Sequence, residues 1–239
     1  MAIARNAPKL GARCALNRSS KLRRNDMWIF SSLSRPELIR RVVDSYAWGG
    51  ESQVLLTLYR GDKVLLKYFD QEWPKGWRIE VVDMLGNGPT YNEILRRYPD
   101  EPCYGFLADD AVLEVPGMLA ELEREAGSEN VAYANDQHHG EAICTMPCIG
   151  GDLVRRVGYL APRNMIHWGV DCIWHEIGRK LGCLRYRPDL TYSHLHPLFG
   201  TGKWDKTYLA AHNGSIFYCD AFRAWAVNEL PKITGEKHA

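Results

Sequence analysis

The first half of the chain alternates short apolar runs with stretches whose apolar residues recur at helical spacing. This alternation restricts the fold more than any other feature, because the runs have the length of buried strands and the stretches bury one helical face. The expected strands are residues 27–30, 53–59, 77–82 and 103–108. Helices are expected to begin near Pro36, Thr90 and Pro116, with an irregular or helical piece at 64–69. The order predicts an α/β fold, a mostly parallel sheet flanked by helices.

The apolar run 103–108 is followed directly by two acids, Asp109 and Asp110. Other expected strands also end in polar residues: Ser31 and Ser32, Arg60 and Asp62, and Asp83. Ligands of open α/β sheets bind at the carboxyl ends of the strands, so these groups converge on one edge. Two acids there can hold a divalent cation and, through it, a phosphorylated ligand. The alternative is an ordinary polar turn, in which Asp is common.

The second half of the chain continues the domain without a linker or an internal repeat. A strand is expected at 130–134, helices at 150–157 and 169–181, and an extended run at 191–196. We therefore expect one domain over residues 27–225, with a first half at 27–126 and a second half at 127–225. Residues 226–239 are expected to form a C-terminal tail.

The chain begins with a basic segment: residues 1–25 hold seven Lys and Arg residues and no acid, although the net charge of all 239 residues is only +1. Such an arm can contact nucleic acid, but we expect residues 1–26 to be disordered. No apolar run approaches the roughly 20 residues that cross a bilayer. The seven cysteines show no paired metal-binding spacing, which indicates free thiols in a reducing compartment. These features predict a cytoplasmic protein.

Five short motifs occur in an order that resembles glycosyltransferases of the GT-A fold, particularly family 2-like enzymes. The resemblance runs from about Met27 to Tyr208 and includes compact phage-type enzymes. The motifs are Ser-x-x-Arg-Pro (32–36), Gly-Pro-Thr-Tyr-Asn (88–92), Ala-Asp-Asp (108–110), His-Trp-Gly-Val-Asp (167–171) and His-Leu-His-Pro (194–197).

The resemblance implies a nucleotide-sugar half at 27–126 and an acceptor half at 127–225, with a metal site on the donor diphosphate. Such enzymes carry Asp-x-Asp after the fourth strand, whereas this chain has Ala108 at the first position and Asp110 at the last. Asp110 is therefore the expected ligand of Mn²⁺ or Mg²⁺, and Asp109 is expected to contact the ribose. A C-terminal histidine completes the site in the family; His194 and His196 both fit, and we prefer His194.

The resemblance also implies roles for other polar residues. Arg35 is expected to pair with phosphate and Tyr59 to stack on the base, while Lys203 lies in a Gly-rich stretch expected to close over the donor. Trp168 is an expected acceptor platform, because sugars and bases stack on indole. The remaining donor-side candidates are Ser32, Asp62, Asp83 and Asn92.

Asp171 is the expected catalytic base, since the family places an acid at the start of a helix in this position. It would take a proton from the acceptor hydroxyl. Stabilisation of the helix N-terminus is the alternative role of an acid there. His175, one helical turn later, is expected to be structural.

Together these features predict a hexosyltransferase that takes a UDP- or GDP-sugar, depends on a metal ion and inverts the anomeric centre. The acceptor is left open between a glycan, a small molecule and a hydroxymethylated base in DNA, and so is the oligomeric state. A sugar-phosphate nucleotidyltransferase is one alternative, although Ser31–Arg35 is not the Gly-rich phosphate loop of that class. An inactive nucleotide-sugar-binding module is the other.

Overall fold

The computed structural model describes residues 27–46, 52–83, 86–166 and 168–235. Within them, one sheet of eight strands has the order β3-β2-β1-β4-β7-β6-β8-β5. The basic segment 1–26 lies outside the described residues. The strands are β1 (Met27–Ser32), β2 (Gln53–Tyr59), β3 (Arg78–Val82), β4 (Cys103–Leu107), β5 (Ala111–Leu113), β6 (Val131–Asn135), β7 (Cys148–Gly150) and β8 (Leu184–His194).

The sheet is mostly parallel, as expected, but it includes antiparallel pairs. Strands β3, β2, β1 and β4 are parallel to one another, as the sequence predicts, and so are β6 and β8. The pairs β4–β7, β6–β7 and β5–β8 are antiparallel. The difference lies in the second half, where the short β7 runs opposite to both of its neighbours.

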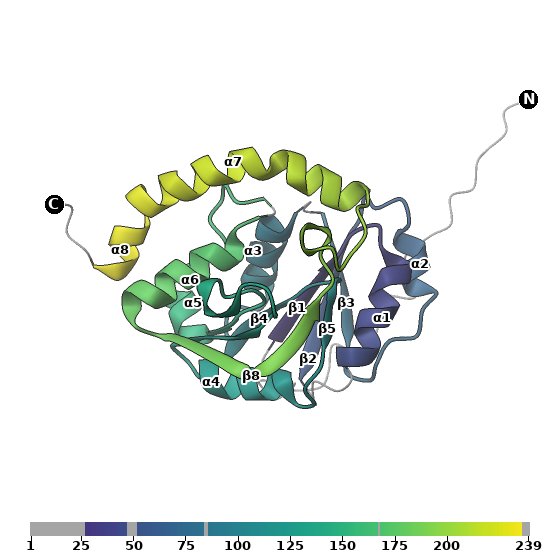
Figure 1. Cartoon of the computed structure of the whole chain (residues 1–239), viewed down its shortest axis with the longest axis horizontal. Helices are drawn as coiled ribbons and strands as arrows, with labels where there is room; N and C mark the ends of the chain where they lie inside the picture. Colours follow the sequence, from purple (N-terminus) through teal and green to yellow (C-terminus); the bar gives the residue numbers. More distant parts are fainter. Residues whose placement is uncertain (1–26, 47–51, 84–85, 167, 236–239) are drawn as a thin grey trace, which may run out of the picture.

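Helices cover both faces of the sheet (Figure 1). Alternate residues of β1 point to opposite faces, so that Trp28 and Phe30 pack with α1 and α4 while Met27 and Ile29 pack with α3, α5 and α6. The helices are α1 (Pro36–Tyr46), α2 (Leu65–Phe69), α3 (Asn87–Arg97), α4 (Met118–Ala126), α5 (Gly151–Val157), α6 (Val170–Leu181), α7 (Lys206–Asn228) and α8 (Leu230–Thr234). This α/β architecture is the one expected.

Helix α1 shows how the sequence determines its packing. Pro36 occupies the first helical position, where a missing amide hydrogen costs no hydrogen bond. Ile39, Val42, Val43 and Tyr46 then form one buried stripe. Each large apolar side chain of this kind contributes roughly 1.5–3 kcal/mol on burial. The stripe fixes α1 on the sheet and brings its N-terminus to the end of β1.

Strand β8 is longer than the expected run 191–196. It begins at Leu184 and has an irregularity near Pro188, where the partners of Ala134 and Asn135 jump from Arg187 to Thr191. A proline cannot donate a hydrogen bond to a neighbouring strand, so a bulge accommodates it. Pro188 and the flanking charged residues concealed the strand from the sequence pattern.

The C-terminal helices extend past the boundary expected at residue 226. Helix α7 ends at Asn228, and α8 follows it as far as Thr234. Trp225 and Leu230 are buried against α6 and its surroundings. Residues up to 235 therefore pack as part of the domain.

The burial of Leu230 predicts a measurable contribution to stability. Leu230→Ala should lower the free energy of unfolding by about 2–4 kcal/mol, because it leaves a cavity in the core. The matched control is Val227→Ala, at a side chain that is 65% exposed; it should change stability by less than about 0.5 kcal/mol. Urea denaturation measures both variants, and equal effects would contradict the packing of α8.

Candidate functional site

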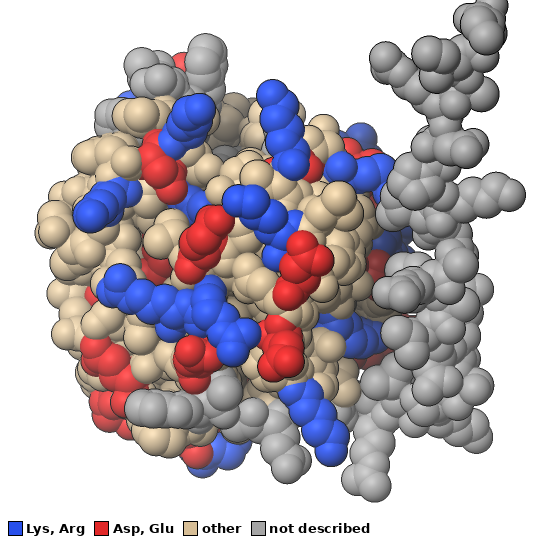
Figure 2. All heavy atoms as spheres, turned by 90° about the vertical axis from the view of Figure 1, so that its right-hand side faces the viewer, with Lys and Arg blue, Asp and Glu red and all other residues tan. Residues whose placement is uncertain are grey.

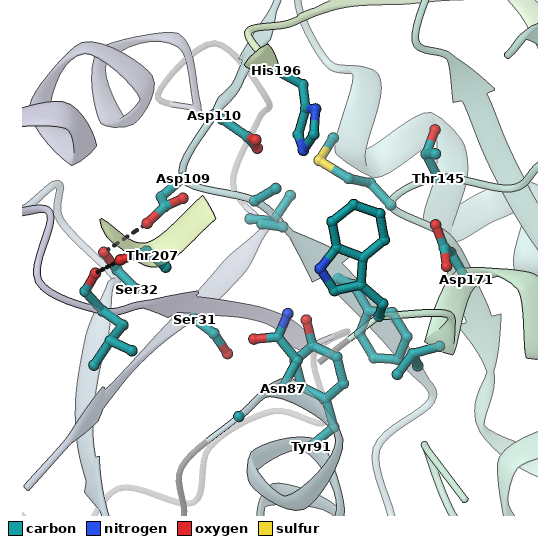
Figure 3. A pocket seen from close by; sticks show the side chains of 18 of the residues that line it. Ser31, Ser32, Asn87, Tyr91, Asp109, Asp110, Thr145, Asp171, His196 and Thr207 are labelled. Carbon is teal, nitrogen blue, oxygen red and sulfur yellow. Dashed lines mark hydrogen bonds between the residues drawn. The ribbon is translucent and has the colours of Figure 1, made fainter. Parts of the chain in front are cut away.

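A cleft of about 470 Å³ opens at the carboxyl ends of β1, β2 and β4. It continues to the start of α6 and to the segment that links β8 with α7. Figure 3 shows Asp109 and Asp110 on one side of this cleft and Asp171 on the opposite side. The strand ends and the second half of the chain therefore line one shared cavity, the position in which open α/β sheets bind ligands.

Most residues singled out by the sequence line this cleft. They come from five separate stretches of the chain and meet only through the fold. The cleft-lining candidates are Ser32, Arg35, Tyr59, Asp109, Asp110, Trp168, Asp171, His194 and His196. His167, the first residue of the motif 167–171, lies outside the described residues.

The turn after β4 presents the two acids to the cleft. Ala108 packs against the core, and its carbonyl accepts hydrogen bonds from the Tyr46 hydroxyl at 2.7 Å and from the Ala111 amide at 3.3 Å. The chain then reverses into β5. Asp109 and Asp110 are only 10% and 12% exposed, so both carboxylates need charged or polar partners.

Arg35 is the cation that compensates Asp109. Its guanidinium donates to Asp109 at 2.8 Å and to both carboxylate oxygens of Asp205 at 2.8 and 2.9 Å. It also lies 4.0 Å from the ring centroid of Tyr208. Burial lowers the pKa of the guanidinium, but the carboxylates raise it further, so Arg35 stays charged. This cluster joins the end of β1, the end of β4 and the start of α7.

The two neighbouring acids have opposite electrostatic environments. Burial raises the pKa of Asp109 above its ordinary value, against the lowering influence of Arg35. Burial also opposes ionisation of Asp110, but His194 and the Tyr208 hydroxyl, which donates at 2.5 Å, hold its pKa below the ordinary value. Asp110 is therefore the more readily ionised member of the pair.

His194 lies between two carboxylates. Its Nε2 is 3.6 Å from Asp110 and its Nδ1 is 3.6 Å from Asp136. Burial lowers the pKa of the imidazole, but the two acids outweigh burial and raise it to about 9. His196 differs: burial lowers its pKa, and its Nδ1 accepts a hydrogen bond from the Leu198 amide at 3.2 Å.

Four further residues near the cleft were missed by the sequence reasoning: Asp136, His139, Asp205 and Tyr208. Asp136 follows β6 as Asp109 follows β4, so the same strand-end signal applied to it. Asp205 caps α7 by accepting from the Tyr208 amide at 2.9 Å, a pattern that an acid before a helix predicts. His139 shows no signal of its own, because its place depends on Asp136.

Asp171 lies in the first turn of α6, where the helix dipole favours a negative charge. One carboxylate oxygen accepts from the Cys172 amide at 2.9 Å. Burial raises its pKa above the ordinary value, and the charge of His139 is among the influences that oppose this rise. His175, on the same helix, contacts the ring of Tyr133 edge-on and does not line the cleft.

Four donor-side candidates lie outside the lining of the cleft. Asp62 is buried and accepts from the backbone of Ser34 and Val64, so that it fastens two turns together. Asn92 joins α3 to the backbone of residues 160–161. The other two, both exposed, are Asp83, which pairs with Arg60 at 2.5 Å, and Lys203.

Few of the described side chains of the cleft are arranged to bind a divalent cation. No group of three or more His, Cys, Asp and Glu side chains with metal-binding geometry occurs in the described part of the chain. Asp110 and Nε2 of His194 nevertheless supply a carboxylate and an imidazole nitrogen 3.6 Å apart. A cation bound there would displace the proton that the two neighbouring acids favour on the imidazole. Two metal ligands from the protein suit a cation whose other ligands come from a phosphorylated substrate.

Solved structures share the architecture at low sequence identity. A mannosyltransferase from Pyrobaculum calidifontis, in complex with GDP-Man and Mn²⁺, matches with a TM-score of 0.56 at 11% identity over 90% of this chain and 73% of that one. The fold is GT-A-like. Staphylococcus aureus TarS matches with a TM-score of 0.51 at 10% identity over 70% of this chain. The chain spans only 36% of TarS, and 59% of its 1–349 fragment. Neither a family model nor a curated protein matches the sequence.

A surface that binds nucleic acid gathers its basic residues into a patch or stripe, and the face formed by the described residues of α1 and α2 lacks this arrangement. Figure 2 shows positive and negative side chains interleaved on this face, rather than a basic stripe. Pairs such as Lys67 with Glu37 and Arg40 with Asp44 belong to these two helices. This face therefore gives no support to a DNA acceptor. None of the described helices is both long and apolar enough to span a membrane.

The Arg35 cluster predicts a large effect of a single substitution. Arg35→Ala should lower the free energy of unfolding by about 3 kcal/mol, because it leaves buried carboxylates without their cation. Arg40→Ala is the control: Arg40 is 53% exposed and 3.8 Å from Asp44, and its loss should cost less than about 1 kcal/mol. Guanidinium denaturation separates these results, and similar stabilities of the two variants would refute the structural role of the cluster.

Proposed function

We propose that the protein is a glycosyltransferase that moves a hexosyl group from a nucleotide sugar to an acceptor hydroxyl. The observation that carries the proposal is the opposition of Asp110 and Asp171 across one cleft of a GT-A-like fold (Figure 3). Residues 27–126 would hold the donor, and residues 127–225 would supply the acceptor wall. The mannosyltransferase from Pyrobaculum calidifontis supports a nucleotide-sugar donor, since it was solved with GDP-Man and Mn²⁺.

The donor diphosphate would lie beside Asp110. A bound Mn²⁺ or Mg²⁺ would neutralise negative charge on the departing nucleoside diphosphate. Asp110 and His194 are the residues proposed to hold it, and Asp136 faces the other ring nitrogen of His194, as carboxylates do behind metal-binding histidines. The engaged Nδ1 of His196 favours His194 over His196. Asp109 and Ser32, which are hydrogen-bonded at 3.0 Å, are proposed to contact the ribose.

The acceptor hydroxyl would approach from the opposite wall. Asp171 is the proposed base: it takes the hydroxyl proton as the oxygen attacks the anomeric carbon and the bond to the diphosphate breaks. Attack from the face opposite the leaving group inverts the anomeric centre. Trp168 lines the same wall and offers a flat apolar surface to the acceptor.

The metal assignment is tested by removing one carboxylate. Asp110→Asn should lower the Mn²⁺-dependent hydrolysis of UDP- or GDP-sugars by at least about 100-fold, the scale of losing one electrostatic stabiliser. Asp189→Asn changes an exposed acid of β8 that does not line the cleft, and it should retain wild-type activity. Full activity in Asp110→Asn would refute the assignment.

The base assignment predicts a pH dependence. A base works only when deprotonated, and burial raises the pKa of Asp171, so kcat/KM should fall on acidification at a pH above the ordinary carboxyl range. Asp171→Asn should lower the transfer rate by about 100-fold or more and remove this acid limb. The measurement is transfer to an acceptor between pH 4 and 8. An unchanged acid limb in the variant would contradict the role of Asp171.

A further inference from the structure

The loop after β6 holds a histidine in the cleft that the proposed mechanism does not use. Asp136, whose side chain is fully buried, accepts the backbone amides of His138 at 3.0 Å and His139 at 2.7 Å through Oδ1. These two bonds close the turn. The other oxygen, Oδ2, lies 2.6 Å from Nδ1 of His139, a contact that the turn itself does not need.

The imidazole of His139 is fixed from two sides. Asp136 binds its Nδ1, and the ring of Phe199 packs edge-on with the centroids 5.2 Å apart. An ionised carboxylate only accepts hydrogen bonds, so Nδ1 carries the proton and, in the neutral ring, Nε2 is an acceptor. Among the described residues, Nε2 has no hydrogen-bond partner. His139 lines the cleft and is 29% exposed, so this nitrogen is accessible to a ligand.

The loop that carries His139 contacts the start of α6, where the Cys144 thiol donates to the backbone carbonyl of Asp171 at 3.1 Å. His139 from this loop and Asp171 from the helix both line the cleft, and the two segments together form one of its walls. The Cys172 amide donates to one carboxylate oxygen of Asp171. A carboxylate has about four lone-pair sites, so it can accept a further hydrogen bond from a ligand. This wall therefore offers two hydrogen-bond acceptors, Nε2 of His139 and the carboxylate of Asp171. The buried carboxylate of Asp136 holds His139, and Asp171 lies at the N-terminus of α6.

We propose that this wall selects acceptors with two neighbouring hydroxyl groups, one donating to Asp171 and the other to Nε2 of His139. The inference rests on the proposed function and names its acceptor class. The preferred acceptor is a polyol such as a sugar ring, rather than a molecule with one isolated hydroxyl. A site built to bind a hydroxyl discriminates against analogues that lack it, because its polar groups are then left without partners. A hydroxymethylated base or a serine side chain offers only one such hydroxyl.

The test uses the full chain with Mn²⁺, UDP-glucose and GDP-mannose as donors, and a matched acceptor pair, cis-1,2-cyclohexanediol and cyclohexanol. Wild-type protein should transfer to the diol with a kcat/KM at least about 10-fold higher than to the mono-alcohol. His139→Ala should reduce this ratio to nearly one, by lowering the rate with the diol more than the rate with the mono-alcohol. His138→Ala is the matched control, since His138 neighbours His139 but does not line the cleft, and it should keep the ratio.

Asp136 acts as a positioning residue in this account. Asp136→Asn should lower the diol preference at saturating donor, because the imidazole of His139 loses the carboxylate that fixes its tautomer. Asp136 also faces His194, so the preference is compared at saturating donor, where a change in donor KM does not affect it. A merely structural role would change the melting temperature without changing the ratio.

The outcomes separate the two levels of the proposal. If wild-type protein consumes the donor but treats the diol and the mono-alcohol alike, or if His139→Ala keeps the preference, the acceptor inference is overturned and the proposed function stands. If wild-type protein consumes neither donor, the proposed function falls and the inference falls with it.

Discussion

The site depends on one buried ion cluster, in which Arg35 bridges Asp109 and Asp205. These residues come from the end of β1, the end of β4 and the start of α7, so the cluster fixes the C-terminal part of the chain against the parallel strands. Burying charges is costly unless each has a partner, and here every member has one. Tyr208 then reaches Asp110 from α7. Without Arg35, the acids at the sheet edge would repel each other and α7 would lose its main contact with the strand ends.

The cleft has two chemically different sides. On the side proposed for the donor, Asp109 pairs with Arg35, and Asp110 lies beside His194. On the side proposed for the acceptor, Asp171 accepts from a backbone amide, and His139 is held by a buried carboxylate. Asp136 links the sides, since its carboxylate contacts His139 and faces His194. Such a division suits a reaction that joins a charged donor to a neutral acceptor.

The sequence predicted the α/β fold and most of the site wherever strong local patterns were present. The strand at 103–107 and its two acids were evident because an apolar run ends abruptly in charge. Asp62 and Asn92 carry the right chemistry, but tertiary contacts direct their side chains to backbone groups. Asp136 was missed although it follows a strand as Asp109 does, and His139 was missed because its place depends on Asp136. The antiparallel pairs of β7 and of β5 were missed because they join segments that lie far apart in the sequence.

The central claim is that donor and acceptor bind on opposite walls of one cleft. The most direct test is a crystal structure of the protein with a nucleoside diphosphate and Mn²⁺, in which anomalous scattering locates the metal. The account predicts a manganese peak bound by Asp110, with the diphosphate on the same side and the wall at Asp171 and His139 left open. A diphosphate bound against Asp171, or a metal bound away from Asp110, would contradict it.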